Sequence, residues 1–230
     1  GLVLQGIGVP PGVAIGPGFL MAQENAHVPE RSITPEQVGG EISRFEEAII
    51  ETRKQIRQIQ EALAGQTRAH DASILDAHLM VLDDRTFIEE VIGSVRDRQK
   101  NIEWMVQEAA DKYAAVLNAV EGDYLRERVA DVHDVGRRII RNLLGDAAPS
   151  QDELPNDHII VAPDLAPSET ASLPKDRIVG FATDLGSPTS HTAVMARALE
   201  LPAVVGLHDI TERVVPGDNV LIDGNKGVLI

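Results

Sequence analysis

The feature that most constrains the fold is a long helical stretch that separates two β-like regions. Apolar residues recur at helical spacing from about residue 34 to residue 144, whereas residues 1–22 and 145–230 hold short Val- and Ile-rich runs broken by Gly, Pro and Asp. The strand-like runs in residues 1–22 have no strand to pair with inside the helical stretch. We therefore expect a discontinuous α/β domain of residues 1–30 and 145–230, interrupted by an α-helical bundle at residues 31–144.

The first helix of the predicted bundle has a clear beginning. Thr34 is a candidate N-cap, Pro35 takes the first helical position, and Gln37 follows three residues after the cap. Its apolar stripe comprises Val38, Ile42, Phe45, Ile49, Ile56, Ile59 and Leu63. Gly65 should end it. Further helical patterns follow Asp71, Asp84, Asn101 and Asp123. Short connections between these helices predict antiparallel neighbours, as in a helical bundle.

The last part of the chain alternates between strand-like and helix-like runs. The strand-like runs are residues 158–162, 177–181, 203–206, 219–223 and 227–230, and the candidate helices are residues 168–173 and 190–199. Alternation of this kind indicates an α/β unit. Because each run is only four or five residues long, we expect a small sheet.

Composition excludes several classes of function. The formal net charge is −15, which argues against binding to nucleic acid or to an anionic membrane surface. No run of eighteen apolar residues predicts a membrane span, and residues 1–5 lack the pattern of a secretory signal. The chain has no cysteine, so the cytoplasm is the simplest compartment. A first residue other than Met suggests a processed or truncated chain.

One of the seven histidines, His191, lies in surroundings suited to an anion. A Gly-Ser-Pro turn at residues 186–188 precedes it, Thr189 and Ser190 are N-cap candidates, and an Ala-rich helix follows. The first turn of a helix presents backbone N–H groups and the positive end of the helix dipole, and Thr192 adds a third hydroxyl. The histidines show no H-x-x-x-H or H-E-x-x-H spacing, so we expect no metal site.

A histidine at this position is suited to carrying phosphate. The dipole favours the neutral, nucleophilic imidazole by about 0.3–1 kcal/mol and then stabilises an attached phosphoryl group. Spacing alone does not separate this chemistry from ordinary helix capping. The sequence holds neither a G-x-S-x-G elbow nor a P-loop. The acidic pairs at residues 83–84 and 89–90 are typical of solvated helix faces.

Four separated segments form a recognisable set: Gly8–Gly16, Asp123–Arg138, Asp164–Thr170 and Thr189–Gly206. Together, and in this order, they resemble Enzyme I of the bacterial phosphotransferase system, a family of phosphoenolpyruvate-protein phosphotransferases that serves sugar transport. The resemblance implies a swivelling phosphohistidine α/β domain with an inserted domain that binds the phosphocarrier protein HPr. It also implies that Nε2 of His191 receives phosphate originating from phosphoenolpyruvate and passes it to HPr.

The resemblance further implies roles for individual residues. Thr170 matches the hydroxyl that orients the second ring nitrogen of the catalytic His191. Arg197, with Thr189, Ser190 and Thr192, would support the phosphate. The candidate HPr-binding residues are Asp76, His78, Met80, Asp84, Leu117, Leu125 and Arg128.

Two departures from the family pattern bear on the choice of carrier. Ser187-Pro188 replaces the usual Gly-Arg, and residues 68–73 lack a run of carboxylates found in some relatives. These departures leave the choice of carrier open, and we expect it to be HPr or a nitrogen-pathway paralogue of HPr.

The resemblance also places a Mg²⁺-dependent, phosphoenolpyruvate-binding and dimerising domain after residue 230. We expect this chain to be a monomer without a cofactor of its own, and the full-length protein to be a homodimer. The 230-residue chain by itself should exchange phosphate with phospho-HPr but should not use phosphoenolpyruvate. Two alternatives remain: the phosphohistidine domain of a pyruvate phosphate dikinase or phosphoenolpyruvate synthase, and a non-enzymatic helical interaction module.

Overall fold

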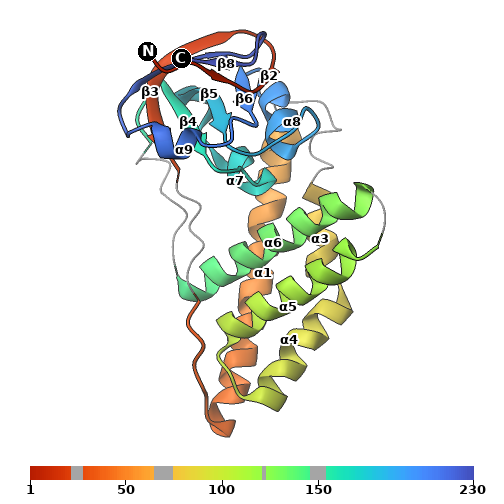
Figure 1. The fold of residues 1–230 in the computed structure, drawn as a ribbon. Helices are drawn as coiled ribbons and strands as arrows, with labels where there is room; N and C mark the ends of the chain where they lie inside the picture. The colour runs from red at the N-terminus through yellow and green to blue at the C-terminus, as the bar shows by residue number, and fades with distance from the viewer. Residues whose placement is uncertain (22–27, 65–74, 121–122, 146–153) are drawn as a thin grey trace. The chain divides into compact units, whose positions relative to one another are not determined.

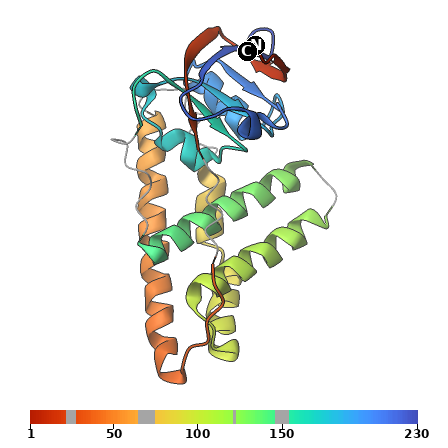
Figure 2. The ribbon, with the colours of Figure 1, turned by 60° about the vertical axis from the view of Figure 1, so that its left-hand side comes forward.

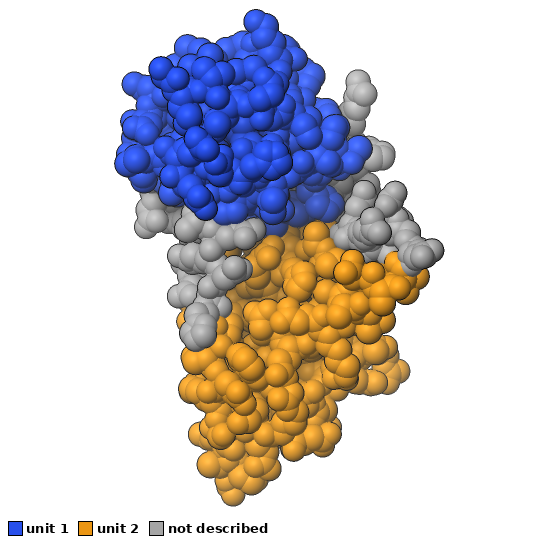
Figure 3. Space-filling model, viewed as in Figure 1, with its two compact units in different colours: residues 1–24, 63–71, 149–230 blue, residues 25–62, 72–148 orange. Residues whose placement is uncertain are grey.

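A computed structural model describes residues 1–21, 28–64, 75–120, 123–145 and 154–230, without the side chains of residues 62–63, 123–127 and 171–172. The chain forms two compact units (Figure 3). The α/β unit contains residues 1–24, 63–71 and 149–230, and the helical unit contains residues 25–62 and 72–148. The expected helix end at Gly65 and helix start at Asp71 lie outside the described residues.

The α/β unit is built on a sheet of eight described strands, in the order β1-β8-β7-β3-β4-β5-β6-β2. The strands are β1 (Leu4–Gln5), β2 (Ile7–Val9), β3 (Val13–Leu20), β4 (His158–Ala162), β5 (Ile178–Thr183), β6 (Ala203–Val205), β7 (Asn219–Asp223) and β8 (Val228–Leu229). Strand β1 pairs with β8, β2 with β6, and β3 with both β7 and β4. The expectation of a small sheet is wrong, because short strands from both ends of the sequence join one sheet.

This sheet curls, since β1 and β2 occupy opposite ends of the strand order although only Gly6 separates them. The close approaches leave no room for side chains on the neighbouring glycines. A Cβ on Gly6 would lie 2.7 Å from the carbonyl oxygen of Val205, and one on Gly8 would lie 2.4 Å from that of Gly224. Glycine is required where backbones approach so closely.

Strands β3 to β6 run parallel, and their alternate residues pack into two cores. Ile160 of β4 faces one core together with Ala193 of α8 (His191–Ala198). Ile159 faces the other core together with Ile210 of α9 (Ile210–Arg213). A third helix, α7 (Pro167–Ser172), packs beside α8. The expected alternation of strands and helices is confirmed.

The described helices of the helical unit are η1 (Pro35–Gln37), α1 (Val38–Ala64), α3 (Asp76–Leu82), α4 (Arg85–Arg98), α5 (Ile102–Asn118) and α6 (Asp123–Leu144). Helices α5 and α6 lie side by side (Figures 1 and 2). The predicted start at Thr34 is confirmed, because its N–H donates to Oε1 of Gln37 at 2.9 Å. Asp84 separates α3 from α4 by accepting hydrogen bonds from the N–H groups of Thr86 and Phe87. No described helix has the length and apolarity needed to cross a bilayer.

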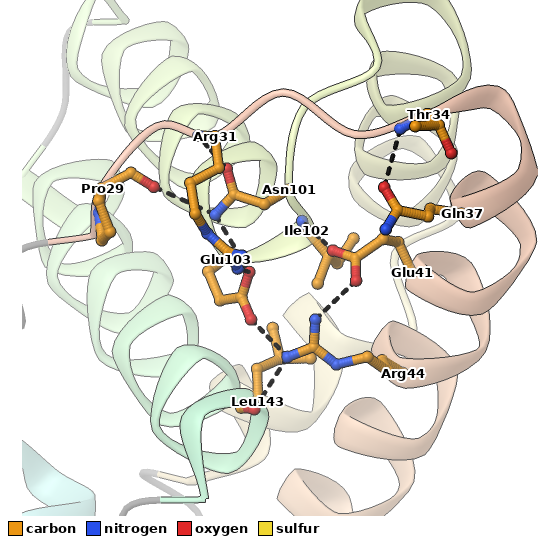
Figure 4. Close-up of polar contacts among 10 residues, drawn as sticks. All are labelled: Pro29, Arg31, Thr34, Gln37, Glu41, Arg44, Asn101, Ile102, Glu103 and Leu143. Atoms are coloured by element: carbon orange, nitrogen blue, oxygen red, sulfur yellow. Dashed lines mark hydrogen bonds and ion pairs between the residues drawn. The ribbon is translucent and has the colours of Figure 1, made fainter.

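Asn101 precedes α5 as predicted, but its side chain makes no capping hydrogen bond. Its Oδ1 accepts from the Arg31 N–H at 2.8 Å, and its Nδ2 donates to the Pro29 carbonyl at 3.2 Å and to Glu103 at 3.1 Å (Figure 4). The bonds to Arg31 and Pro29 take the place of a local cap and fasten the segment before α1 to α5.

Glu103 links three helices through Arg44 (Figure 4). Its buried carboxylate accepts from the guanidinium of Arg44, which also donates to the Leu143 carbonyl at 3.1 Å and to Glu41 at 2.7 Å. Burial disfavours the charged carboxylate. Hydrogen bonds from its own backbone N–H, from Arg44 and from Asn101 outweigh burial and hold the pKa of Glu103 below its ordinary value.

We predict that Glu103→Ala lowers the free energy of unfolding of the helical unit by about 2–3 kcal/mol, since Arg44 and Asn101 each lose a buried charged acceptor and keep only their other hydrogen bonds. Urea titration followed by Trp104 fluorescence measures this, because Trp104 is the only tryptophan and lies in α5. The matched control is Glu108→Ala on the same helix, which removes an exposed ion pair with Arg98 and should change little. Equal effects of the two variants would contradict the prediction.

Candidate functional site

His191 is the first residue of α8 and is half-buried, immediately after the N-cap Ser190. The loop that precedes it starts at the carboxyl end of β5. There the Asp184 N–H donates to the Ala162 carbonyl at 3.2 Å, and the Leu185 N–H donates to the Pro163 carbonyl at 2.9 Å. His191 therefore follows a loop fastened to the carboxyl ends of two adjacent parallel strands, β4 and β5. Open α/β sheets bind ligands in this region.

Hydroxyl groups hold the turn before His191 in place. Ser190 Oγ accepts the Ala193 N–H at 3.4 Å and donates to the Ser187 carbonyl at 2.9 Å. The hydroxyls of Ser187 and Thr189 lie 3.3 Å apart, and the Thr189 N–H donates to Ser187 Oγ at 3.3 Å. Ser187 and Thr189 are exposed, so their oxygens stay accessible beside the start of α8. Together with the helix dipole, this arrangement suits a bound anion.

Thr192 does not belong to this accessible group. Its side chain is fully buried, and its hydroxyl donates to the Leu165 carbonyl at 3.2 Å. The bond fastens the first turn of α8 to the segment before α7. The sequence-based expectation that Thr192 supports a phosphate is corrected here, because a buried hydroxyl that is already bonded does not reach a solvent-borne ligand.

Thr170 lies buried on α7, which packs against α8. Its hydroxyl donates to the Ala166 carbonyl at 3.0 Å, one turn earlier on the same helix. A hydroxyl has one proton and two acceptor lone pairs. With its proton so used, the oxygen of Thr170 is left to act as an acceptor, which is what an imidazole N–H requires.

Arg197 is exposed near the end of α8 and donates from Nη1 to the Pro188 carbonyl at 2.8 Å. The contact joins the last turn of the helix to the loop before His191. A guanidinium has five N–H donors, so this bond leaves others for a phosphate, and that role stays a prediction.

Asp184 is a site residue that motif reasoning missed. Its buried carboxylate accepts from the Thr211 N–H at 3.0 Å and from the Thr211 hydroxyl, and its carbonyl accepts the His208 N–H at 2.8 Å. These bonds join the loop before His191 to α9 and to the connection between β6 and α9. The position of an aspartate directly after a strand was the sequence signal that could have identified Asp184.

The turn before His191 requires glycine at position 186. At Gly186, φ is +128°, and a Cβ would lie 2.8 Å from the Val205 Cβ.

Some of the candidate carrier-binding residues lie together on the helical unit. Met80 of α3 is 62% exposed, and Arg128 of α6 approaches its sulfur at 3.9 Å. Asp84, the N-cap of α4, accepts a hydrogen bond from the Tyr113 hydroxyl, which raises the pKa of Tyr113 to about 12. Leu117 lies one turn after Tyr113 on α5. We call Met80, Asp84, Tyr113, Leu117 and Arg128 the Met80 face.

The remaining candidates differ in position. Asp76 is exposed at the start of α3 and accepts from Nε2 of Gln60 at 2.8 Å. The side chain of Leu125 lies outside the described part of the chain.

His78 is fully buried, with Nε2 2.7 Å from Oδ2 of Asp134. This corrects the expectation that His78 touches a carrier directly, because no partner reaches a buried ring. Within the described residues, no group of three or more His, Cys, Asp or Glu side chains is arranged to hold a metal ion.

The fold and site define a class: a small α/β domain with a histidine at a helix start, interrupted by a helical domain. Residues 5–128 match the family described as PEP-utilising enzyme, N-terminal, and residues 154–227 match PEP-utilising enzyme, mobile domain. The chain belongs to the PEP-utilising enzymes. Within this family its similarity is to Enzyme I, as its relatives make clear.

Phosphoenolpyruvate-protein phosphotransferase of Listeria monocytogenes is 37% identical over 227 residues, covering 99% of this chain and 39% of the relative. The protein of the same name from Haemophilus influenzae is 34% identical over 221 residues, covering 96% and 38%. The chain thus spans about two fifths of these relatives.

Solved structures agree with the curated relatives. An NMR solution structure of an Enzyme I protein superposes with a TM-score of 0.78 at 39% identity, and an N-terminal domain of the nitrogen Enzyme 1 superposes with 0.68 at 28%. Each match covers 99% of this chain and 92% of the other.

We predict that Thr192→Val lowers the stability of the α/β unit by about 1–2 kcal/mol, since the Leu165 carbonyl loses its buried donor. Calorimetric unfolding measures the change. Thr189→Val, at an exposed hydroxyl in the same turn, is the control and should leave the transition nearly unchanged. An unaltered transition for Thr192→Val would show that its hydroxyl does not fasten α8.

Proposed function

We propose that this chain is a phosphoryl relay in which His191 receives phosphate originating from phosphoenolpyruvate and passes it to HPr. The observation that carries the proposal is the placement of a half-buried His191 at the start of α8 with accessible hydroxyls beside it. The membership of the family and the similarity to phosphoenolpyruvate-protein phosphotransferases support it.

The chemistry is a nucleophilic displacement at phosphorus. The lone pair of Nε2 of His191 forms the new nitrogen–phosphorus bond while the bond to the leaving group breaks, and the leaving group keeps that electron pair. In the next step a nitrogen of the carrier attacks the same phosphorus, and the electron pair returns to His191. The covalent intermediate divides one transfer into two.

Two local features favour Nε2 as the nucleophile. If Thr170 Oγ1 accepts the proton of Nδ1, the tautomer is fixed and the Nε2 lone pair faces the donor. The positive end of the α8 dipole disfavours the imidazolium and stabilises the phosphoryl group after transfer. Arg197 acts on the same site by holding the Pro188 carbonyl and, in our proposal, by offering its other donors to phosphate.

The Met80 face is our proposed docking surface for the carrier. It combines an exposed thioether and a leucine with the charges of Arg128 and Asp84, a mixture suited to a transient encounter. Asp76 and Leu125 extend the proposal along α3 and α6. The structural match to the nitrogen Enzyme 1 keeps a paralogue of HPr as the second candidate carrier.

The donor chemistry belongs, in our proposal, to the part of the relatives that this chain does not span. That part makes up more than half of each relative's length. We place phosphoenolpyruvate binding, Mg²⁺ and homodimerisation there, and the whole relay in the cytoplasm. The 230-residue chain then acts as a monomeric acceptor and donor that needs no cofactor of its own.

We predict that incubation with phospho-HPr labels His191, as located by mass spectrometry, and that His191→Ala abolishes labelling. Thr170→Val should slow labelling by about tenfold to a hundredfold through loss of the oriented tautomer. His208→Ala, at another histidine of the α/β unit, is the control. Phosphoenolpyruvate with Mg²⁺ but no carrier should leave this chain unlabelled. Labelling under those conditions would refute the proposed location of the donor site.

We predict that Met80→Ala weakens HPr binding by about tenfold, because an exposed apolar residue at the centre of an interface carries much of its energy. Isothermal titration calorimetry measures the dissociation constant. Ile50→Ala is matched, since Ile50 is 63% exposed on α1 of the same unit, and it should bind HPr like the wild type. Equal affinity of Met80→Ala and wild type would remove the Met80 face as the docking surface.

A further inference from the structure

A cluster of buried charges lies between α3 and α6 of the helical unit. The His78 ring contributes from α3, and the carboxylates of Asp131 and Asp134 contribute from successive turns of α6. His78 Nε2 lies 2.7 Å from Asp134 Oδ2, and Nδ1 lies 3.9 Å from Asp131 Oδ1. His78 is 0% exposed and both carboxylates are 3% exposed, so little water screens them. The relay chemistry uses none of these groups.

The charge balance of the cluster sets the protonation of His78. Arg138, also buried on α6, adds one positive charge, and its Nη1 donates to neutral Gln55 of α1 at 3.3 Å. Two carboxylates and one guanidinium leave a net charge of −1 if the imidazole is neutral, and of zero if it is protonated. An uncompensated charge in a buried site is costly. Among these four groups the charges sum to zero only when His78 is protonated, and Arg137, which also acts on Asp134, is only half-buried.

The electrostatic influences on His78 oppose one another, and those that favour the charged ring are the stronger. Burial works against the charged ring, and Arg138 does so to a smaller extent. The hydrogen bond and charge of Asp134, with the charge of Asp131, outweigh both and raise the pKa of His78 above its ordinary 6.5. His78, Arg138 and Arg137 in turn lower the pKa of Asp134 to about 2 against the effect of burial.

The same pair of helices carries part of the Met80 face on its outer side. Met80 follows His78 by two residues on α3, and Arg128 precedes Asp131 by three residues on α6. The Met80 sulfur and the Arg128 guanidinium meet at 3.9 Å. The α3–α6 contact thus has a buried ionic layer and an exposed docking layer. A shift of α3 along α6 would separate the partners of both layers.

We propose that His78 is a positioning residue that, as an imidazolium between Asp131 and Asp134, fixes α3 on α6 and so makes carrier docking depend on its protonation. The inference rests on the proposed docking role of the Met80 face. The sign of the pH effect follows from a pKa that is raised by folding. The stabilising contribution is complete below pH 6.5 and is lost as the pH rises through the higher pKa of folded His78.

The first test is the charge state of His78, which needs no carrier. Long-range ¹H–¹⁵N NMR of the 230-residue chain should show both ring nitrogens of His78 protonated at pH 7, with a titration midpoint above 6.5. Asp131→Asn should lower that midpoint. Asp111→Asn, which removes the partner of the more exposed His133, should leave it unchanged. A neutral His78 at pH 7, or a midpoint insensitive to Asp131→Asn, would overturn the inference.

The second test is HPr binding by calorimetry between pH 6 and pH 9. The affinity of the wild type for HPr should fall roughly tenfold as His78 deprotonates. His78→Gln should bind weakly with no such pH dependence. His133→Gln, at a histidine that is paired with Asp111 and 35% exposed, should behave like the wild type. Trp104 fluorescence checks that each variant is folded, and Asp131→Asn replaces His78→Gln if that variant unfolds.

The outcomes separate this inference from the docking proposal. If His78→Gln keeps the affinity and the pH profile of the wild type, the pH dependence belongs to the carrier and the positioning role is wrong, although docking stands. If the wild type itself does not bind the carrier, the docking function fails and the positioning role fails with it.

Discussion

The pairing of β3 with both β7 and β4 is the constraint on which the α/β unit depends. Strand β3 bonds to β7 in antiparallel and to β4 in parallel orientation, although more than 130 residues separate it from either. Backbone groups buried in a sheet must find partners, and the helical region offers none to an extended strand. The insertion therefore leaves and re-enters one sheet, and the chain ends lie in neighbouring strands β1 and β8.

This sheet determines where His191 lies. Its parallel centre brings the ends of β4 and β5 together, and α7 and α8 follow directly after them. The helices that carry Thr170 and His191 consequently pack against each other, although the two residues are 21 positions apart in the sequence. Buried bonds from Thr192 to Leu165 and from Asp184 to Thr211 then restrict how the loop moves. His191 is half-buried on a support that is itself well bonded.

Local signals were sufficient to predict much of this fold. Thr34 and Gln37 mark the start of the first helix, and Asp84 marks the break between α3 and α4. Each forms its hydrogen bond with a group no more than three residues away, so the local sequence specifies it directly. The size of the sheet was mispredicted because strand pairing joins distant segments. Asn101 has the residue type of a cap, but Pro29 and Arg31 lie in another segment and take its side chain. The role of Thr192 in binding phosphate was mispredicted, because its hydrogen-bond partner Leu165 lies 27 positions earlier and residue spacing does not reveal that contact.

His78 shows the same limit and also gives it a physical meaning. Resemblance transfers a position along α3 but not its exposure, and here the ring faces Asp131 and Asp134. A buried ion cluster adds little net stability over apolar packing of equal volume. The cluster differs from apolar packing because its hydrogen bonds are directional. Hydrogen-bonded charges are compatible with one register between two helices, whereas apolar side chains can pack in several. A cluster beneath Met80 and Arg128 is therefore better explained by the geometry it imposes on them than by the stability it adds.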